Sequence, residues 1–190
     1  MLAAGAGRRM GRPKALVELD GQPLVRRALA VLDGGGCAPL VVVLGAAAGA
    51  VGAVLPPGVT AVTADGWAEG MGASLRAGLA ALAALDPVPA AALVHLVDLP
   101  GVTAAAVARL RDAASGPATL LRAAYAGRAG HPVVLGRDHW AGVTAAATGD
   151  AGARGYLAGH PGLRAVECGD LADPGDVDTP EQLARFRSPR

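Results

Sequence analysis

The sequence predicts one three-layer α/β domain, residues 1–190, built on a mostly parallel sheet. Short runs rich in valine and leucine alternate with segments of helical periodicity along the whole chain, and this alternation is typical of parallel βαβ architecture. A chain of 190 residues can also bury a substantial core. Because no repeat, linker or low-complexity segment interrupts the pattern, we expect one domain.

The first predicted strand is unusually short. Leu2–Ala4 are apolar and are followed at once by a glycine-rich loop, whereas a strand of a buried sheet usually has about five or six residues. The sequence therefore predicts a truncated first strand: either the true start lies upstream of Met1, or the chain lacks part of this strand.

The remaining elements follow in order. Asp20-Gly21 predicts a turn, and Pro23 is expected at the first position of a helix that runs to Leu32 and ends before three glycines. Thr103 and Thr179 are expected to cap the starts of later helices. We predict strands at 40–44, 59–63, 91–98, 118–123, 130–136 and 163–168, and helices at 46–55, 74–84, 104–114, 138–147, 154–158 and from 180 onward.

One long uncharged segment needs a separate interpretation. Residues 34–64 contain no charged side chain and could span a bilayer by length alone. Glycines and prolines interrupt the segment, however, and much of it is alanine. The pattern favours a strand, a short helix and a second strand over a membrane helix.

Composition argues against several classes of partner. The formal net charge is +1, so no overall field attracts nucleic acid or a membrane surface. Cys37 and Cys168 fit no metal-binding spacing, and no apolar signal-peptide core precedes the first arginines. We therefore expect a cytoplasmic protein with reduced cysteines.

The opening loop is the strongest candidate site. Gly5, Gly7 and Gly11 lie among four basic side chains and no acidic one. Backbone N–H groups and fixed cations together form a cradle for phosphates. Lys14 is the only lysine beside 16 arginines, and a lysine ammonium is a compact point charge that an arginine cannot replace at a phosphate.

Two carboxylates are candidates for a metal site. Asp98 follows an apolar strand, and Asp178 precedes the last helix. Mg²⁺ usually takes one or two carboxylates together with phosphate oxygens, and ligands bind beyond the carboxyl ends of parallel strands. Each residue also has a structural interpretation as a loop or helix cap, and Asp176 competes with Asp178 for the metal role.

Several short motifs occur in a fixed order along the chain. The first comprises Leu2-Ala-Ala-Gly, Arg9-Met-Gly and Pro13-Lys14. The later ones are Trp67-Ala-Glu-Gly-Met71, Ser74-Leu-Arg-Ala-Gly78, Val97-Asp-Leu-Pro100, Gly130-His-Pro-Val133, Gly149-Asp-Ala-Gly-Ala-Arg154 and Asp176-Val-Asp-Thr-Pro-Glu181. In these motifs and their order, over essentially the whole chain, the sequence resembles the MobA-like NTP transferase family, in particular its molybdenum cofactor cytidylyltransferases.

The resemblance implies a Rossmann-like fold and a Mg²⁺-dependent transfer of a nucleoside monophosphate from an NTP to a phosphorylated acceptor. Arg9 and Lys14 would stabilise charge on the phosphates, and Asp98 and Asp178 would hold Mg²⁺. The Ala3-Ala4-Gly5 triplet goes with CTP rather than GTP within the family. The residues that the resemblance assigns to the nucleotide are Leu2, Ala3, Ala4, Gly5, Gly7, Gly70, Met71 and Ser74.

The acceptor is expected to be molybdopterin or the molybdenum cofactor, contacted by His131 and Arg154, with a molybdenum hydroxylase as a further partner. Val97-Asp-Leu-Pro100 departs from the Gly-Asp-Gln-Pro of many relatives, so sugar phosphates and other cofactor precursors remain alternative acceptors. A nucleotide-binding protein that delivers cofactor without catalysis is the other alternative.

Overall fold

The central sheet is assembled from two groups of strands that meet at the short first strand. In the computed structural model, which describes residues 1–187, β1 (Leu2–Ala3) pairs in parallel with β4 (Val41–Leu44). β4 pairs in parallel with β5 (Thr60–Thr63). On the other side of β1, Leu2 forms a parallel bridge with Leu96.

The second group begins with β6 (Ala91–Val94), which directly precedes that bridge. It continues through β8 (Arg128–Gly136) and β7 (Leu120–Tyr125) to β9 (Leu163–Glu167). β8 is antiparallel to both of its neighbours, whereas the β7–β9 pairing is parallel. The sheet is therefore mostly parallel, as the sequence predicts.

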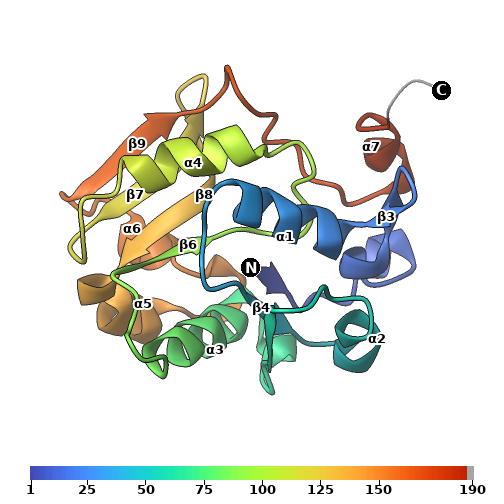
Figure 1. Ribbon diagram of the computed structural model, residues 1–190, viewed down its shortest axis with the longest axis horizontal. Coiled ribbons are helices and arrows are strands. Elements are labelled where there is room, and N and C mark those ends of the chain that lie inside the picture. Colours follow the sequence, from blue (N-terminus) through green and yellow to red (C-terminus); the bar gives the residue numbers. More distant parts are fainter. Residues whose placement is uncertain (188–190) are drawn as a thin grey trace.

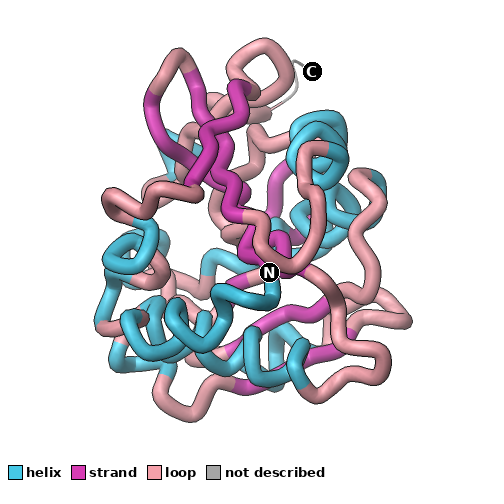
Figure 2. The backbone as a smooth tube through the Cα atoms, turned by 90° about the vertical axis from the view of Figure 1, so that its left-hand side faces the viewer, coloured by secondary structure: helices cyan, strands magenta, loops and turns pink. Residues whose placement is uncertain are grey.

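Helices cover both faces of the sheet (Figure 1). Leu121, Ala123 and Val134 pack with Leu110 of α4 (Ala104–Asp112), and α1 (Leu24–Gly34) lies beside α4. The alternate residues of β7 and β8 pack against α3 (Met71–Ala83) and α5 (Trp140–Ala146). In the side view, strands run between the helices (Figure 2).

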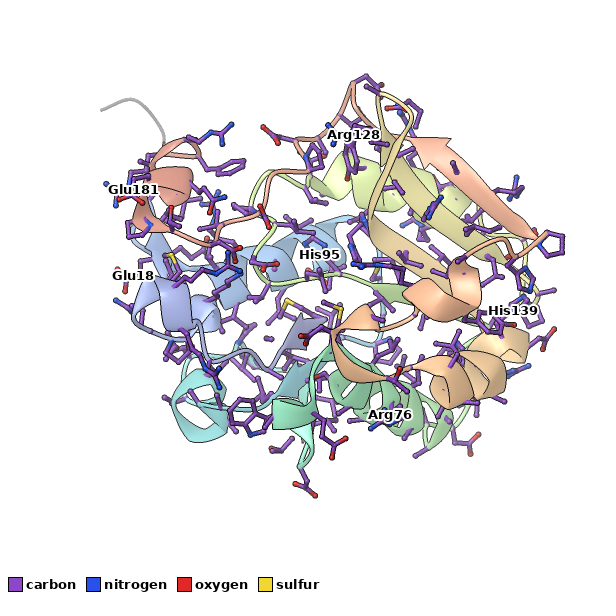
Figure 3. The ribbon with its side chains drawn as sticks, turned by 180° about the vertical axis from the view of Figure 1, so that it is seen from behind. Glu18, Arg76, His95, Arg128, His139 and Glu181 are labelled. Atoms are coloured by element: carbon purple, nitrogen blue, oxygen red, sulfur yellow. The ribbon has the colours of Figure 1, made fainter. Side chains whose placement is uncertain are left out.

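The smaller elements lie at the margins of these layers. They are β2 (Glu18–Leu19), β3 (Gln22–Pro23), α2 (Ala48–Gly52), α6 (Arg154–Leu157), α7 (Pro180–Ala184) and the 3₁₀ turns Arg8–Met10, Lys14–Leu16, Trp67–Glu69, Arg137–His139 and Gly149–Ala151. α7 lies beside the β2–β3 hairpin, so the last described helix returns to the first loops (Figures 1 and 3).

Both predicted threonine caps are confirmed. The Thr103 hydroxyl accepts from the N–H of Ala106, and the Thr179 hydroxyl accepts from the N–H of Gln182. Pro23 is not the first helical residue as predicted, because it still pairs with Glu18 in the hairpin, and α1 begins at Leu24. Each cap satisfies a backbone donor that the first helical turn leaves free.

The structure corrects two further boundaries. The predicted strand at 91–98 ends at Val94, and Asp98 lies in the turn that follows the bridge to β1. The segment at 130–136 is part of a nine-residue strand, Arg128–Gly136, which forms a hairpin with β7. This hairpin is hard to predict because its two-residue turn, Ala126-Gly127, has an alanine at φ 50° where asparagine or aspartate is the usual signal.

The uncharged segment at 34–64 forms β4, α2 and β5, which confirms the predicted strand–helix–strand order. Across residues 1–187, no helix is long and apolar enough to cross a membrane.

Candidate functional site

The candidate site forms around Lys14, at the edge where β1 and β6 end. The Lys14 ammonium donates to Asp98 Oδ2 at 2.6 Å and also to Asp178 Oδ1. Arg9 contributes a second cation, whose guanidinium lies 2.7 Å from Asp178 Oδ2. Residues that are 84 and 164 positions away from Lys14 in the sequence therefore meet at one cation. The structure thus brings together both predicted catalytic residues and both predicted metal ligands.

The opening loop is held in a fixed fold by close backbone contacts. Gly7 has φ 62°, and a Cβ atom there would lie 2.0 Å from the carbonyl oxygen of Arg12. Only glycine fits such a position. Gly11, with φ 69°, ends the turn that carries Arg9. Pro13 then precedes the turn Lys14–Leu16, which aims the lysine across the sheet edge.

Asp98 and Asp178 are held together by their neighbours. The N–H of Val177 donates to the carbonyl of Asp98 at 2.9 Å, and the Val177 side chain is fully buried. The Gln182 side-chain oxygen accepts from the N–H groups of both Asp178 and Thr179, at 2.7 and 2.9 Å. The capping box of α7 therefore also fixes the backbone of a candidate metal ligand.

Lys14 and Asp178 each stabilise the charged form of the other. Burial alone would lower the pKa of Lys14, but hydrogen bonds from its ammonium to Asp178 and Asp98 outweigh burial, and the pKa is raised. The hydrogen bond from Lys14 lowers the pKa of Asp178, although desolvation opposes this shift. The three side chains are 15–21% exposed. At neutral pH the site is therefore an ammonium between two carboxylates.

Two carboxylates that converge on one cation fit the requirements of a divalent metal. In the structure, the Lys14 ammonium stands where both carboxylates direct an oxygen. No group of three or more histidine, cysteine, aspartate or glutamate residues with the geometry of a metal site occurs among residues 1–187. The donor set suits Mg²⁺ or Mn²⁺, because such ions complete their coordination with water and phosphate oxygens.

The predicted nucleotide-binding residues lie in three places: β1, the loop that follows it, and the start of α3. Ala3 and Ala4 are buried, so a nucleotide could contact only their main chain, whereas Gly5 is exposed. Leu2 lies in β1, where its N–H donates to the His95 carbonyl at 2.9 Å and its carbonyl accepts from the N–H of Val97 at 3.2 Å. Gly7 contributes to the loop fold described above.

Gly70, Met71 and Ser74 lie at the start of α3. Gly70 has φ 116°, and a Cβ there would lie 2.6 Å from Asp150 Oδ1. The start of α3 therefore packs on the 149–154 loop. The Ser74 side chain is only 4% exposed, so its role in contacting a nucleotide stays a prediction.

Of the predicted acceptor residues, His131 lies within electrostatic reach of both Asp98 and Arg154. Burial lowers the pKa of His131, Asp98 opposes that shift and Arg154 adds to it. The Tyr125 hydroxyl donates to the His131 carbonyl at 2.6 Å and fixes the backbone there. His95 is buried and lines a cavity with residues of α1 (Figure 3).

Gln182 is the positioning residue that the sequence reasoning missed. Thr179-Pro-Glu-Gln182 is a capping-box pattern, with a threonine three residues before a glutamine, and the pattern could have identified it. The structure also separates the two competing aspartates, because the carboxylate of Asp178 contacts Lys14 and Arg9, whereas Asp176 is exposed.

Comparisons with known proteins identify the family of this chain. The chain belongs to the MobA-like NTP transferase family, whose domain model matches residues 1–165. It is 41% identical to nicotine blue oxidoreductase of Paenarthrobacter nicotinovorans, over 98% of this chain and 94% of that protein.

Solved structures of relatives share the fold. Rv0371c from Mycobacterium tuberculosis H37Rv is 32% identical with a TM-score of 0.79, covering 97% of this chain and 94% of its own. A second structure of Rv0371c, with 29% identity and a TM-score of 0.76 over the same shares of the two chains, is a complex with manganese. A nucleotidyl transferase from Methanothermobacter thermautotroptrophicus is 25% identical with a TM-score of 0.80, covering 98% and 93% of the two chains. The predicted Rossmann-like nucleotidyltransferase fold is therefore confirmed.

Proposed function

We propose that this member of the MobA-like NTP transferase family transfers CMP from CTP to a phosphorylated acceptor and releases pyrophosphate. The observation that supports this most directly is the convergence of Lys14, Asp98 and Asp178 beside a glycine-rich loop. Phosphoryl and nucleotidyl transfer depend on positioning and charge stabilisation rather than on a covalent protein nucleophile. The site offers this kind of chemistry, and the cytoplasm supplies the NTP.

In the proposed reaction, a phosphate oxygen of the acceptor attacks the α-phosphorus of the NTP. The bond between the α-phosphorus and the oxygen bridging to the β-phosphorus breaks, and that oxygen leaves with the electron pair as part of pyrophosphate. Arg9 and Lys14 would stabilise the negative charge on the phosphates and the leaving group. Asp98 and Asp178 would hold a divalent cation, which neutralises phosphate charge when bound.

The nucleotide would lie between the opening loop and the start of α3. The exposed backbone at Gly5 can approach a ligand closely, and Gly70 and Met71 begin a 13-residue helix whose N–H groups face the same edge. CTP is the proposed donor because the chain carries Ala3-Ala4-Gly5 at the position that resembles the cytidylyltransferases.

Molybdopterin or the molybdenum cofactor is the proposed acceptor. His131 lies within electrostatic reach of Asp98 and of Arg154, so the two proposed acceptor residues offer a ring and a guanidinium near the metal site. An arginine fork suits the terminal phosphate of such an acceptor. A molybdenum hydroxylase would then receive the finished cofactor. Mg²⁺ is the proposed cation, and the manganese in Rv0371c supports a divalent metal at this fold.

Reduction of a coloured substrate is the second candidate, because the curated relative at 41% identity is named nicotine blue oxidoreductase. A nucleotide-binding fold could hold a dinucleotide reductant such as NAD(P)H. The intact set of two carboxylates around a lysine favours transfer, since hydride transfer requires no such cation site.

The test is a matrix of donors and acceptors. Purified protein is incubated with Mg²⁺, each of the four NTPs and each acceptor, including molybdopterin and sugar phosphates, and pyrophosphate is measured. We expect release with CTP and molybdopterin. Binding of CTP without release of pyrophosphate under any combination would favour the cofactor-delivery protein. Oxidation of NAD(P)H by nicotine blue would favour the reductase.

A further inference from the structure

Lys14 has two roles that it cannot fill at the same time. In the proposed function it contacts the phosphates, yet in the structure its ammonium donates to one oxygen of Asp98 and one of Asp178. A divalent cation held by the same two carboxylates would need those oxygens. The lysine and the metal therefore compete for one position.

The surroundings allow the lysine to leave. Its side chain is 19% exposed, so one side of it already faces solvent. Lysine carries a compact charge on a flexible four-carbon stem, whereas an arginine fork would hold a carboxylate in a fixed bidentate geometry. Lys14 also follows the exposed loop that carries Gly11 and Arg12, on the side where the phosphates of the proposed function lie.

We propose that Lys14 is a displaceable counter-ion: it holds Asp98 and Asp178 together before metal arrives, and the divalent cation displaces it toward the phosphates. The inference rests on the metal assignment of the proposed function. It assigns Lys14 a positioning role in the metal-free protein, in addition to the phosphate contact. It also implies an order, because the lysine becomes available to the nucleotide only after a cation has entered.

The first test measures the binding of Mn²⁺ alone by electron paramagnetic resonance, without nucleotide. Lys14→Met removes the competing cation and keeps the apolar stem. We expect the variant to bind Mn²⁺ roughly tenfold more tightly, since the metal no longer breaks hydrogen bonds between charged groups.

Arg12→Met is the matched control. Arg12 carries the same charge in the same loop, but its guanidinium donates to the carbonyl of Leu16 and contacts neither carboxylate. Its removal should change Mn²⁺ affinity by about twofold or less, because exposed charges are screened. Unchanged or weaker Mn²⁺ binding by Lys14→Met would overturn the proposal.

The second test uses the wild-type chain and therefore does not depend on a variant that folds. Lys14 is the only lysine, so acylation with an N-hydroxysuccinimide ester can be followed at one side chain by peptide mass spectrometry. We expect Mg²⁺ to accelerate acylation of Lys14 several-fold over NaCl of equal ionic strength, because the displaced amine is exposed.

Asp98→Asn provides the internal check on acylation. The variant loses the charge on one of the two oxygens that hold the ammonium, so Lys14 should react faster without metal, and Mg²⁺ should add little. Equal acylation of the wild type with and without Mg²⁺ would contradict displacement.

These outcomes are distinguishable from those of the donor and acceptor assay. Metal-dependent exposure of Lys14 without pyrophosphate release would keep the counter-ion role and reject the transfer reaction. Pyrophosphate release while Lys14 stays protected from acylation, with or without Mg²⁺, would support the transfer reaction and reject the counter-ion role.

Discussion

A single lysine among arginines is the most informative residue in this chain. Its identity could be singled out from the sequence because the opening loop contains Arg8, Arg9 and Arg12, and only position 14 differs in the type of cation. Its partners could not be predicted from spacing. The ion pairs with Asp98 and Asp178 depend on where two distant turns meet, and only the folded sheet edge determines that.

Removing either sign of charge from this cluster should reduce catalysis. We expect Lys14→Ala and Asp98→Ala each to lower turnover by about 10²-fold or more, the typical loss when a preorganised charge is removed from a transition state. The measurement is the rate of pyrophosphate release at saturating NTP, accompanied by circular dichroism to check the fold.

Arg12→Ala serves as the reference for these two variants, because Arg12 is exposed and its bond within the described structure is to a backbone carbonyl. It should retain activity within a few-fold. If Lys14→Ala and Asp98→Ala were as active as Arg12→Ala, the site assignment would be wrong.

At the scale of elements, α7 positions Asp178, the residue proposed as a metal ligand. Its capping box places Gln182 against the backbone N–H of Asp178, and Val177 anchors the preceding turn in the core. The helix has only five residues, so its capping bonds contribute a large part of its stability.

Gln182→Ala should therefore impair the site, although the Gln182 side chain acts through the backbone of Asp178 and is not proposed to contact the substrate. Loss of the side-chain oxygen leaves the N–H groups of Asp178 and Thr179 without that acceptor, and we expect about 1 kcal/mol lower stability. Turnover should fall by several-fold, and the Mg²⁺ concentration for half-maximal activity should rise. Thermal unfolding and a Mg²⁺ titration of turnover check both expectations.

Glu181→Ala is the neighbouring control, since Glu181 lies in the same helical turn and bonds to the Thr179 side chain, whereas the backbone N–H groups of Asp178 and Thr179 donate to Gln182. A Mg²⁺ requirement that rises equally in both variants would show that the effect comes from the helix as a whole and not from Gln182.

The elements themselves were predictable where periodicity is strong. The strands at 41–44 and 60–63, helices α1, α3 and α4, and both threonine caps lie close to their predicted places. The 128–136 strand was underestimated because Ala126-Gly127 is not one of the common hairpin-turn pairs, and the pairing of β8 between β6 and β7 depends on contacts across the sheet. Such non-local contacts leave no periodic signal in one sequence.

At the scale of the whole molecule, the sheet is weakest where its two groups of strands join. β1 has two residues, and a cavity of about 200 Å³ lies beside it, between β4, β6 and α3. Its walls are mostly apolar and include Leu40, Leu79 and Leu93. The α-amino group of Met1 is buried at this junction and donates to the Val41 carbonyl at 2.7 Å.

In the chain that begins at Met1, the buried amine lowers the stability of the fold as the pH falls. A paired lysine such as Lys14 does the opposite, because its pKa is raised. Burial lowers the pKa of this amine from 8.0 to about 5, although the Cys37 thiol opposes the shift. Between these values the unfolded chain binds a proton that the folded chain does not. This group therefore costs no stability above about pH 8, and its cost grows as pH falls toward 5.

Extending the chain before Met1 should separate this charge effect from packing. Adding Val-Leu-Val replaces the amine with a peptide N–H and places apolar side chains next to the cavity, whereas adding Gly-Ser-Gly replaces only the amine. Both extensions should raise the melting temperature more at about pH 6 than at about pH 8.5, because only the 190-residue chain with a free amine at Met1 carries the pH-dependent cost. Val-Leu-Val should raise it further at both pH values, since each apolar side chain that becomes buried contributes about 1.5 kcal/mol or more. Equal melting temperatures for the two extended chains would show that the junction gains nothing from apolar packing, and equal gains at the two pH values would show that the buried amine carries no such cost.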